Sequence, residues 1–277
     1  MTRSLALSLL LGLSLLGSTV SGCSCSGDES DAGGGGSSSN TNSNGTNTGG
    51  GTTGTGFTEG QVIGIEIEPA SATILVDNGA IPPATDFKVF ALKDDNSKAE
   101  VTGNWTFNRP DIAQTNGAGD VTATGLLGGD GTLQATYGTF TATAQVTVKL
   151  KIDSDPESIP QNIKDLFGTA NTADPTMALL YPYNGTVFPR GLTGPVVQWN
   201  GGGAADVYRV HMESTHFEFT GWGTVPPPSR YALPTAPEDV WRKLTDSSSG
   251  NLAVEVQRYD GTSAYLPIQH TWKIAPG

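Results

Sequence analysis

The sequence predicts an all-β protein with two tandem β-sandwich domains behind a segment that does not fold. Several short stretches alternate between apolar and polar residues, which is the period of a half-buried strand. Clusters of Gly, Asn and Asp separate these stretches, as turns do. The 277 residues are enough for two modest domains, yet only 36% are hydrophobic and 37 are glycine, which fits a front part without a core.

The charge balance and the cysteine count exclude several classes of function. The net charge is −12, with 15 Lys and Arg against 27 Asp and Glu, whereas nucleic-acid binding requires clustered cations. We therefore expect no nucleic-acid partner. The 2 cysteines lie two positions apart and cannot build a disulfide scaffold or a four-ligand zinc site.

Residues 1–22 have the pattern of a secretory signal peptide. Arg3 precedes the apolar run from Leu5 to Leu16, which is too short to cross a hydrocarbon core of about 30 Å. Val20-Ser21-Gly22-Cys23 then resembles the bacterial lipobox. The resemblance implies lipidation of Cys23 and a membrane partner through that anchor. Because Ser24 rather than Asp follows, it also implies an extracytoplasmic position at the outer membrane.

Residues 23–60 form a tether that we expect to be disordered. From Ala32 to Thr58 there is no charged residue and almost only Gly, Ser, Asn and Thr. Such a segment buries too little apolar surface to offset its backbone entropy.

Residues 61–151 form the first predicted domain. Ile63, Ile65 and Ile67 alternate with polar residues or glycine, and the run from Ala142 to Leu150 alternates more strictly. Three motifs of this domain resemble the bacterial immunoglobulin-like domains of group 2. They are Ile65-x-Ile67-x-Pro69, Pro110-Asp111-Ile112-Ala113 and Leu133-Gln134-Ala135-Thr136-Tyr137-Gly138. The resemblance covers about ninety residues and implies an extracytoplasmic sandwich that acts as a spacer or an adhesive module.

Residues 152–173 are expected to be a linker with one short helix. Asp153, Asp155 and Glu157 surround a proline, which is typical of a domain boundary, and they have the spacing to offer carboxylates to Ca²⁺. The Gly and distal Glu of an EF-hand loop are missing, so a solvated linker is the favoured interpretation. Ser158 and Gln161 predict a capping box, with a helix that ends at Gly168.

Residues 174–277 form the second predicted domain. Tyr208, Val210 and Met212 alternate with polar residues, as do Val254 and Val256. The order of the motifs in this domain resembles that of a fibronectin type III-like sandwich. The motifs are Pro195-x-x-x-Trp199, Tyr208-x-Val210 and Val254-x-Val256, the last of which precedes an Asp-Gly turn.

No motif of a known catalytic site is present, so we expect no enzymatic activity, no catalytic residues, no cofactor and no metal. His211 and Glu213 share a strand face, and surface positions are the plain interpretation. The candidate binding platform, for a surface glycan or a protein, consists of aromatic residues near a Gly- and Pro-rich segment: Phe217, Phe219, Trp222 and Tyr231. The alternative is that Phe217 and Phe219 fill the core while Trp222 packs the loop.

The sequence thus indicates a non-catalytic cell-surface lipoprotein that serves as a spacer or an adhesion module. The alternative is an accessory or N-terminal portion of a secreted enzyme, acting on polysaccharide or another substrate, whose catalytic part lies elsewhere. Ala275-Pro276-Gly277 resembles the start of a linker, which keeps that alternative open.

Overall fold

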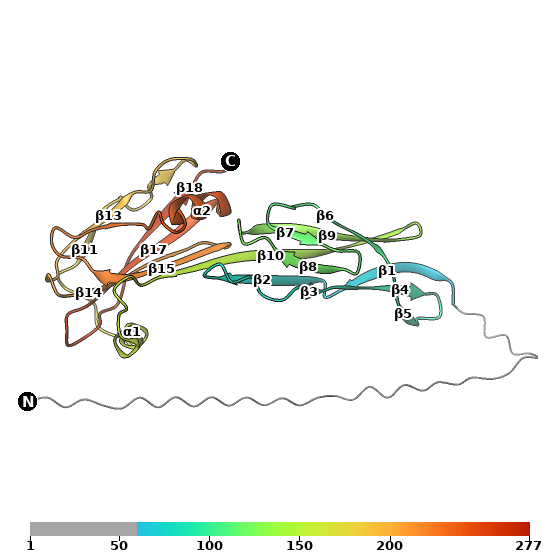
Figure 1. The fold of residues 1–277 in the computed structure, drawn as a ribbon, viewed down its shortest axis with the longest axis horizontal. Coiled ribbons are helices and arrows are strands. Elements are labelled where there is room, and N and C mark those ends of the chain that lie inside the picture. Colours follow the sequence, from blue (N-terminus) through green and yellow to red (C-terminus); the bar gives the residue numbers. More distant parts are fainter. Residues whose placement is uncertain (1–59) are drawn as a thin grey trace, which may run out of the picture. The chain divides into compact units, whose positions relative to one another are not determined.

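The computed structural model describes residues 60–277, which belong to one compact unit (Figure 1). The predicted signal peptide, Cys23 and nearly all of the predicted tether lie outside the described residues. Within residues 60–277, no helix has the length and apolar character needed to cross a membrane.

The first half of the described chain is a β-sandwich, as the alternating sequence predicts. One layer holds the sheets β1-β4-β5 and β3-β8-β7, and the other holds β2, β10, β9 and β6. The side chains of Phe87, Ile112 and Leu133 are completely buried in its core. The strands are β1 Val62–Glu68, β2 Ser71–Asp77, β3 Thr85–Asp86, β4 Lys88–Lys93, β5 Lys98–Val101, β6 Asn104–Phe107, β7 Ala113–Thr115, β8 Asp120–Ala123, β9 Gly129–Tyr137 and β10 Phe140–Ser154.

The second half is a second sandwich. A three-stranded sheet, β11-β13-β16, faces the strands β12-β18-β17-β14-β15 of the large sheet. Tyr208, Phe217, Phe219 and Trp272 fill the space between them and are at most 1% exposed. The strands are β11 Ala178–Tyr181, β12 Val187–Phe188, β13 Val196–Asn200, β14 Val207–Glu213, β15 Phe217–Thr224, β16 Arg230–Ala232, β17 Gly250–Tyr259 and β18 Ile268–Ile274.

Strand β10 belongs to both sandwiches. Residues from Phe140 to Val148 pair with β9 in antiparallel fashion, and residues from Leu150 to Ser154 pair with β15 in parallel. Its other edge pairs with β2 in parallel. The large sheet therefore continues from one sandwich into the other, as Figure 1 shows along β10 and β15. The prediction that the chain breaks into a linker at residue 152 is wrong for Ile152, Asp153 and Ser154, which are strand residues.

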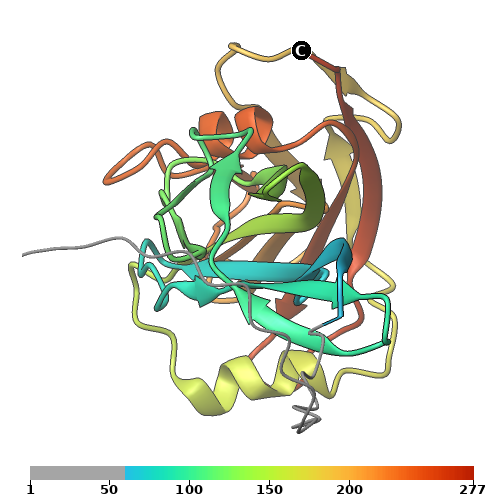
Figure 2. The ribbon, with the colours of Figure 1, turned by 90° about the vertical axis from the view of Figure 1, so that its right-hand side faces the viewer.

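Two helices accompany the sandwiches, and the sequence indicated only one of them. Helix α1, Gln161–Gly168, lies where a helix was predicted, but its N-cap is Pro160 and no side chain caps it. Ser158 has a positive φ of 54° in the preceding turn, so the predicted capping box does not form. Helix α2, Val240–Ser247, was missed, although Asp239 caps it by accepting a hydrogen bond from the Arg242 amide. Figure 2 shows the two helices at opposite sides of the strands.

Candidate functional site

The outer face of the large sheet in the second half carries polar side chains on neighbouring strands. Arg209 on β14 lies opposite Trp222 on β15 and opposite Gln257 on β17, so the three side chains form one row across the sheet. The next row holds His211 and Thr220, whose Nδ1 and Oγ1 atoms are 3.1 Å apart.

Helix α1 packs on this outer face, where it contacts Trp222 of β15 and Gln257 of β17. The ring of Phe167 meets that of Trp222 edge-on, with centroids 5.2 Å apart. The ammonium of Lys164 lies 5.1 Å from the centroid of the Trp222 ring. Gln257 Nε2 donates to the carbonyl of Phe167 at 3.3 Å. These contacts make a small apolar cluster outside the main core, and the helix forms a wall that rises from the sheet.

The three carboxylates of the predicted linker contact the helix wall or the strand β15 beneath it. Asp153 accepts a hydrogen bond from Trp222 Nε1 at 3.2 Å, and Asp155 pairs with Lys164 at 2.8 Å. Glu157 accepts from the Thr224 amide at 3.1 Å. The three groups therefore have separate partners, which differs from both a solvated linker and a shared Ca²⁺ site. Burial alone would raise the pKa of Asp155, but the Lys164 ammonium and the Ile159 amide outweigh it and lower that pKa.

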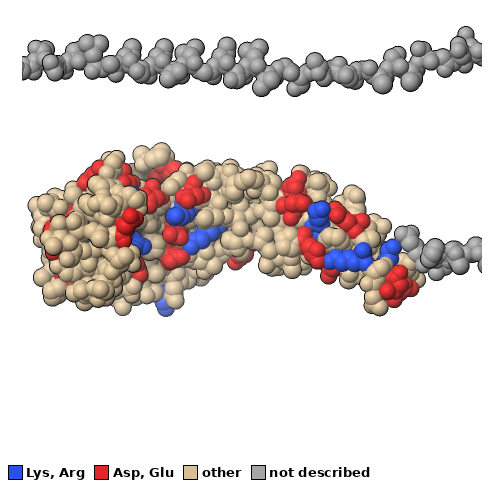
Figure 3. All heavy atoms as spheres, turned by 90° about the horizontal axis from the view of Figure 1, so that it is seen from below, with Lys and Arg blue, Asp and Glu red and all other residues tan. Residues whose placement is uncertain are grey.

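A cleft of about 790 Å³ lies between the α1 wall and the first sandwich. Asp77 and Asn78, at the end of β2, form the opposite wall, and the helix contributes residues from Gln161 to Thr169. Figure 3 shows acidic and basic side chains mixed on the face of the molecule that carries α1. The floor consists of sheet residues: Lys151, Asp153, Arg209, Glu218, Thr220 and Trp222.

Most charged groups of the cleft have partners of opposite charge. Lys151 lies 3.8 Å from Asp77, and Glu218 pairs with Lys149 at 3.1 Å. Arg209 differs: its one polar side-chain contact within residues 60–277 is the hydrogen bond from Nη1 to Gln257 Oε1 at 2.8 Å. Arg209 is half-buried, its guanidinium carries five N–H donors, and no carboxylate of the described residues forms an ion pair with it.

The predicted aromatic platform is not assembled on one surface. Phe217 and Phe219 are completely buried between the sheets, and Tyr231 on β16 extends from the facing sheet toward Gly221. Burial raises the pKa of Tyr231 to about 12. Trp222 lies on the opposite face of β15 and is only 8% exposed beneath α1. The burial agrees with the alternative interpretation for the two phenylalanines, while Trp222 packs a helix rather than a loop.

The histidines occupy separate places. His211 is 8% exposed, so the expected surface position is wrong. His216 Nε2 lies 2.9 Å from Asp130 Oδ2 of the first sandwich. Among residues 60–277, no three His, Cys, Asp or Glu side chains are grouped in a way that would hold a metal ion.

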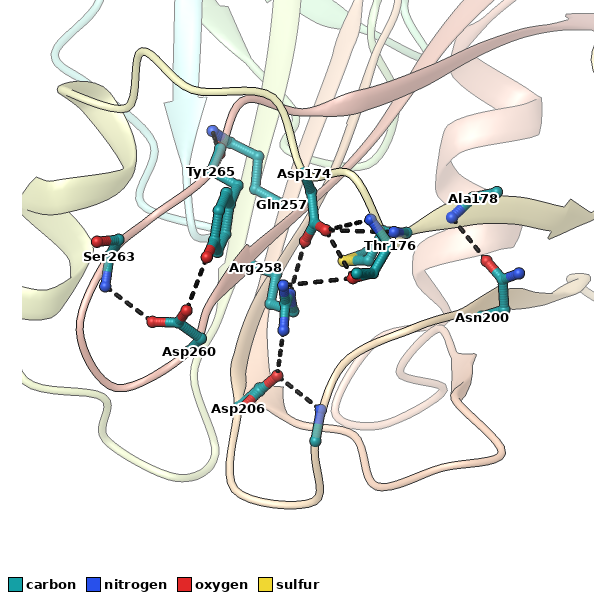
Figure 4. Close-up of polar contacts among 12 residues, drawn as sticks. Asp174, Thr176, Ala178, Asn200, Asp206, Gln257, Arg258, Asp260, Ser263 and Tyr265 are labelled. Carbon is teal, nitrogen blue, oxygen red and sulfur yellow. Dashed lines mark hydrogen bonds and ion pairs between the residues drawn. The ribbon is translucent and has the colours of Figure 1, made fainter.

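A second polar cluster, centred on Arg258, joins loops at the far end of the second sandwich (Figure 4). Arg258 Nε lies 2.6 Å from Asp174 Oδ2, and Nη1 lies 2.9 Å from Asp206 Oδ2. Asp206 also accepts from the Gly203 amide at 2.7 Å. The guanidinium pairs with both carboxylates within the cluster, which assigns the Arg258 cluster to holding the loops together.

Comparisons with known proteins give similarity only at the level of structure. No family model matches the chain, and no curated protein matches it in sequence. Domains 5–6 of the S-layer protein SbsC are 11% identical, with 79% of this chain and 100% of that chain covered and a TM-score of 0.25. Human protocadherin-24 EC1-2 is 10% identical, with coverage of 77% and 100% and a TM-score of 0.23. Immunoglobulin domains 1–4 of Sidekick-1 are 9% identical, with coverage of 76% and 51% and a TM-score of 0.23. TM-scores this low carry no argument about function.

Proposed function

We propose that this protein is a non-catalytic extracytoplasmic spacer, anchored to the outer membrane through lipidated Cys23, in which two sandwiches act as one stiff body. The observation that carries the proposal is strand β10. A strand that is hydrogen-bonded within both sandwiches leaves no free residue between them to act as a hinge.

Further contacts on both sides of β10 support a stiff joint. The Leu150 amide donates to the His216 carbonyl at 3.0 Å, and the Gly128 amide donates to Ser247 Oγ at 2.9 Å. Lys149 on β10 reaches Glu213 on β14 at 2.8 Å. The apolar core is also continuous between the halves. A spacer benefits from such a joint, because bending would shorten the distance it holds.

The finer assignments belong to this proposal as well. The first half is a group 2 bacterial immunoglobulin-like domain, with support from its motif order and its two-layer topology. The second is a fibronectin type III-like domain, with support from a three-stranded sheet packed against five strands of the large sheet. The predicted tether of residues 23–60 would hold both away from the membrane.

Limited proteolysis tests the stiff joint. Subtilisin cleaves unstructured segments, so digestion of the full chain should remove the predicted tether and leave one fragment that contains both sandwiches. Mass spectrometry of the fragments locates the cuts. Early cleavage between residues 150 and 158, which yields two separate domains, would contradict the proposal.

Metabolic labelling tests the anchor. Growth with an alkyne analogue of palmitate should label the wild type and Cys25→Ser equally and leave Cys23→Ser unlabelled. Cys25→Ser is the matched control, because it removes the other thiol of the chain. Equal labelling of Cys23→Ser and the wild type would refute the lipid anchor without affecting the stiff joint.

A further inference from the structure

We infer that the cleft beside α1 binds a neutral saccharide, with Arg209 as its main hydrogen-bond donor. This inference goes beyond the spacer function, because a spacer requires no ligand. It starts from the incomplete set of contacts around Arg209. Removing a guanidinium from water costs free energy unless acceptors replace the water. Here one donor is used and the side chain is half-buried at the floor of an open cleft.

The position of Arg209 is fixed before any ligand binds. Its strand pairs on both edges, with β15 and with β17, so its backbone lies in the middle of the large sheet. Gln257 holds the guanidinium and is itself held by the carbonyls of Phe167 and Tyr265. A donor that is held in this way loses little conformational entropy on binding.

The remaining cleft residues supply hydrogen-bonding groups and apolar surface for a sugar ring that carries several hydroxyl groups. Hydroxyls both donate and accept, and the two walls offer carboxylates and amides in Asp77, Asn78, Gln161 and Asp165. Phe167 and Trp222 add apolar surface at the base of the helix wall. The volume of about 790 Å³ lies within the range of small-ligand sites.

The charges of the cleft argue against other ligand classes. Four carboxylates face three cations among its lining residues, in a chain of net charge −12, so a phosphate or a strongly acidic ligand would meet repulsion. Two apolar side chains among so many polar ones are too few to bind a lipid or an apolar peptide. A neutral, hydroxyl-rich ligand satisfies both conditions.

Titration of the full chain with neutral hexasaccharides tests the site. We name maltohexaose, cellohexaose, xylohexaose and chitohexaose as probes, inorganic phosphate as the anionic comparison, and calorimetry as the measurement. At least one hexasaccharide should bind, and Arg209→Gln should weaken that binding about tenfold or more, since hydrogen bonds to charged groups contribute about 1.5–3 kcal/mol. Arg242→Gln is the matched control: this arginine lies on α2, is 78% exposed and does not line the cleft.

A second variant separates loss of binding from loss of the fold. It is needed because Arg209 also forms a hydrogen bond with Gln257, so that Arg209→Gln could disturb the sheet. Asp165 lies on the exposed helix wall, where its side chain contacts Gln161, so Asp165→Ala should leave the thermal midpoint unchanged and weaken binding several-fold. Binding that is equal in Arg209→Gln, Asp165→Ala and the wild type would overturn the inference. So would the absence of binding by all four hexasaccharides, or tighter binding of phosphate than of any of them. None of these results would affect the proposed spacer.

Discussion

Trp222 illustrates how one residue position decides between two functions. Phe217 and Phe219 differ from Trp222 by an odd number of positions on the same strand, and successive strand side chains point to opposite faces. The phenylalanines therefore enter the core while the tryptophan points outward to meet α1. The sequence contained this signal, but the helix that covers the indole is recruited through contacts that no local pattern shows.

The first prediction concerns the stability that Trp222 contributes. Trp222→Ala removes a ring that packs on Phe167 and Val207, so we expect the free energy of unfolding to fall by about 3 kcal/mol. Urea unfolding of the full chain measures this loss. Tyr183→Ala is the control, because Tyr183 is 73% exposed and its removal should change stability by less than about 0.5 kcal/mol. A stability for Trp222→Ala equal to that of the control would restore the exposed-platform interpretation.

Arg258 is the residue on which the loops of the second sandwich depend. The side chains of Asp174 and Asp206 are 1% and 11% exposed, and the guanidinium is the cation that pairs with both of them. Arg258→Ala leaves two buried carboxylates that keep hydrogen bonds from Thr176 and Gly203 but have lost their cation, and it should cost about 3–5 kcal/mol. Thermal unfolding detects the loss. Arg230→Ala is a suitable control, since Arg230 lies at an exposed position on β16. Similar midpoints for the two variants would show that the Arg258 cluster contributes little.

The carboxylates of this region also predict how stability depends on pH. Hydrogen bonds from the Ser263 amide, the Tyr265 hydroxyl and the Thr262 amide lower the pKa of Asp260 to about 2. Burial alone would raise the pKa of Asp174, but hydrogen bonds from Arg258 and Thr176 outweigh it and lower that pKa. A lowered pKa stabilises the fold above the unfolded value of about 4, and this stabilisation is lost as pH falls through the folded value.

We therefore expect the urea midpoint of the wild type to fall steadily between about pH 4 and pH 2. Asp260→Asn removes one of the titrating groups, so its midpoint should fall less steeply over the same range. A midpoint that is constant from pH 5 to pH 2, or equal slopes for the variant and the wild type, would contradict this assignment.

At the scale of elements, the sequence predicted the strand β10 and its buried face but not its pairing with β15. The alternation from Ala142 to Leu150 predicted a strand with one buried face, and Ala144, Val146, Val148 and Leu150 are buried. Its last residues, Ile152 to Ser154, read as a boundary because acidic residues and a proline follow. Their partner, β15, lies more than sixty positions later in the chain, and such distant pairing leaves no mark in the local sequence.

Interrupting β10 should separate the two sandwiches. The Leu150 amide donates to the carbonyl of His216, directly before β15, so the two-residue period of the ladder directs the Ile152 amide toward β15. Ile152→Pro removes this donor, and calorimetry should show two unfolding transitions in place of one. Ile152→Val keeps the donor and should retain a single transition at a slightly lower temperature. A single transition for Ile152→Pro would mean that the paired segment does not couple the halves.

For the whole molecule, the sequence predicted the two sandwiches and a helix between them. It did not predict that strand β10 joins the sandwiches. Strand periodicity is a local pattern that the sequence shows directly. The cleft instead forms from β2, β10, α1, β14 and β15, which only the fold brings together. The sequence indicated the polar face that contains Arg209 only through His211 and Glu213, which it placed on the outward face of one strand. The missing ion partner of Arg209 is visible only when its neighbours on both adjacent strands are known.

The central claim is that the two sandwiches move as one body. Spin labels at two exposed strand positions, Thr122 on β8 and Thr271 on β18, measure the separation of the halves in a chain whose Cys23 and Cys25 are replaced by Ser. Electron–electron double resonance should give one narrow distance distribution in the wild-type background and a broad one in Ile152→Pro. A broad distribution in the wild-type background, equal to that of Ile152→Pro, would contradict a stiff joint and with it the proposed spacer.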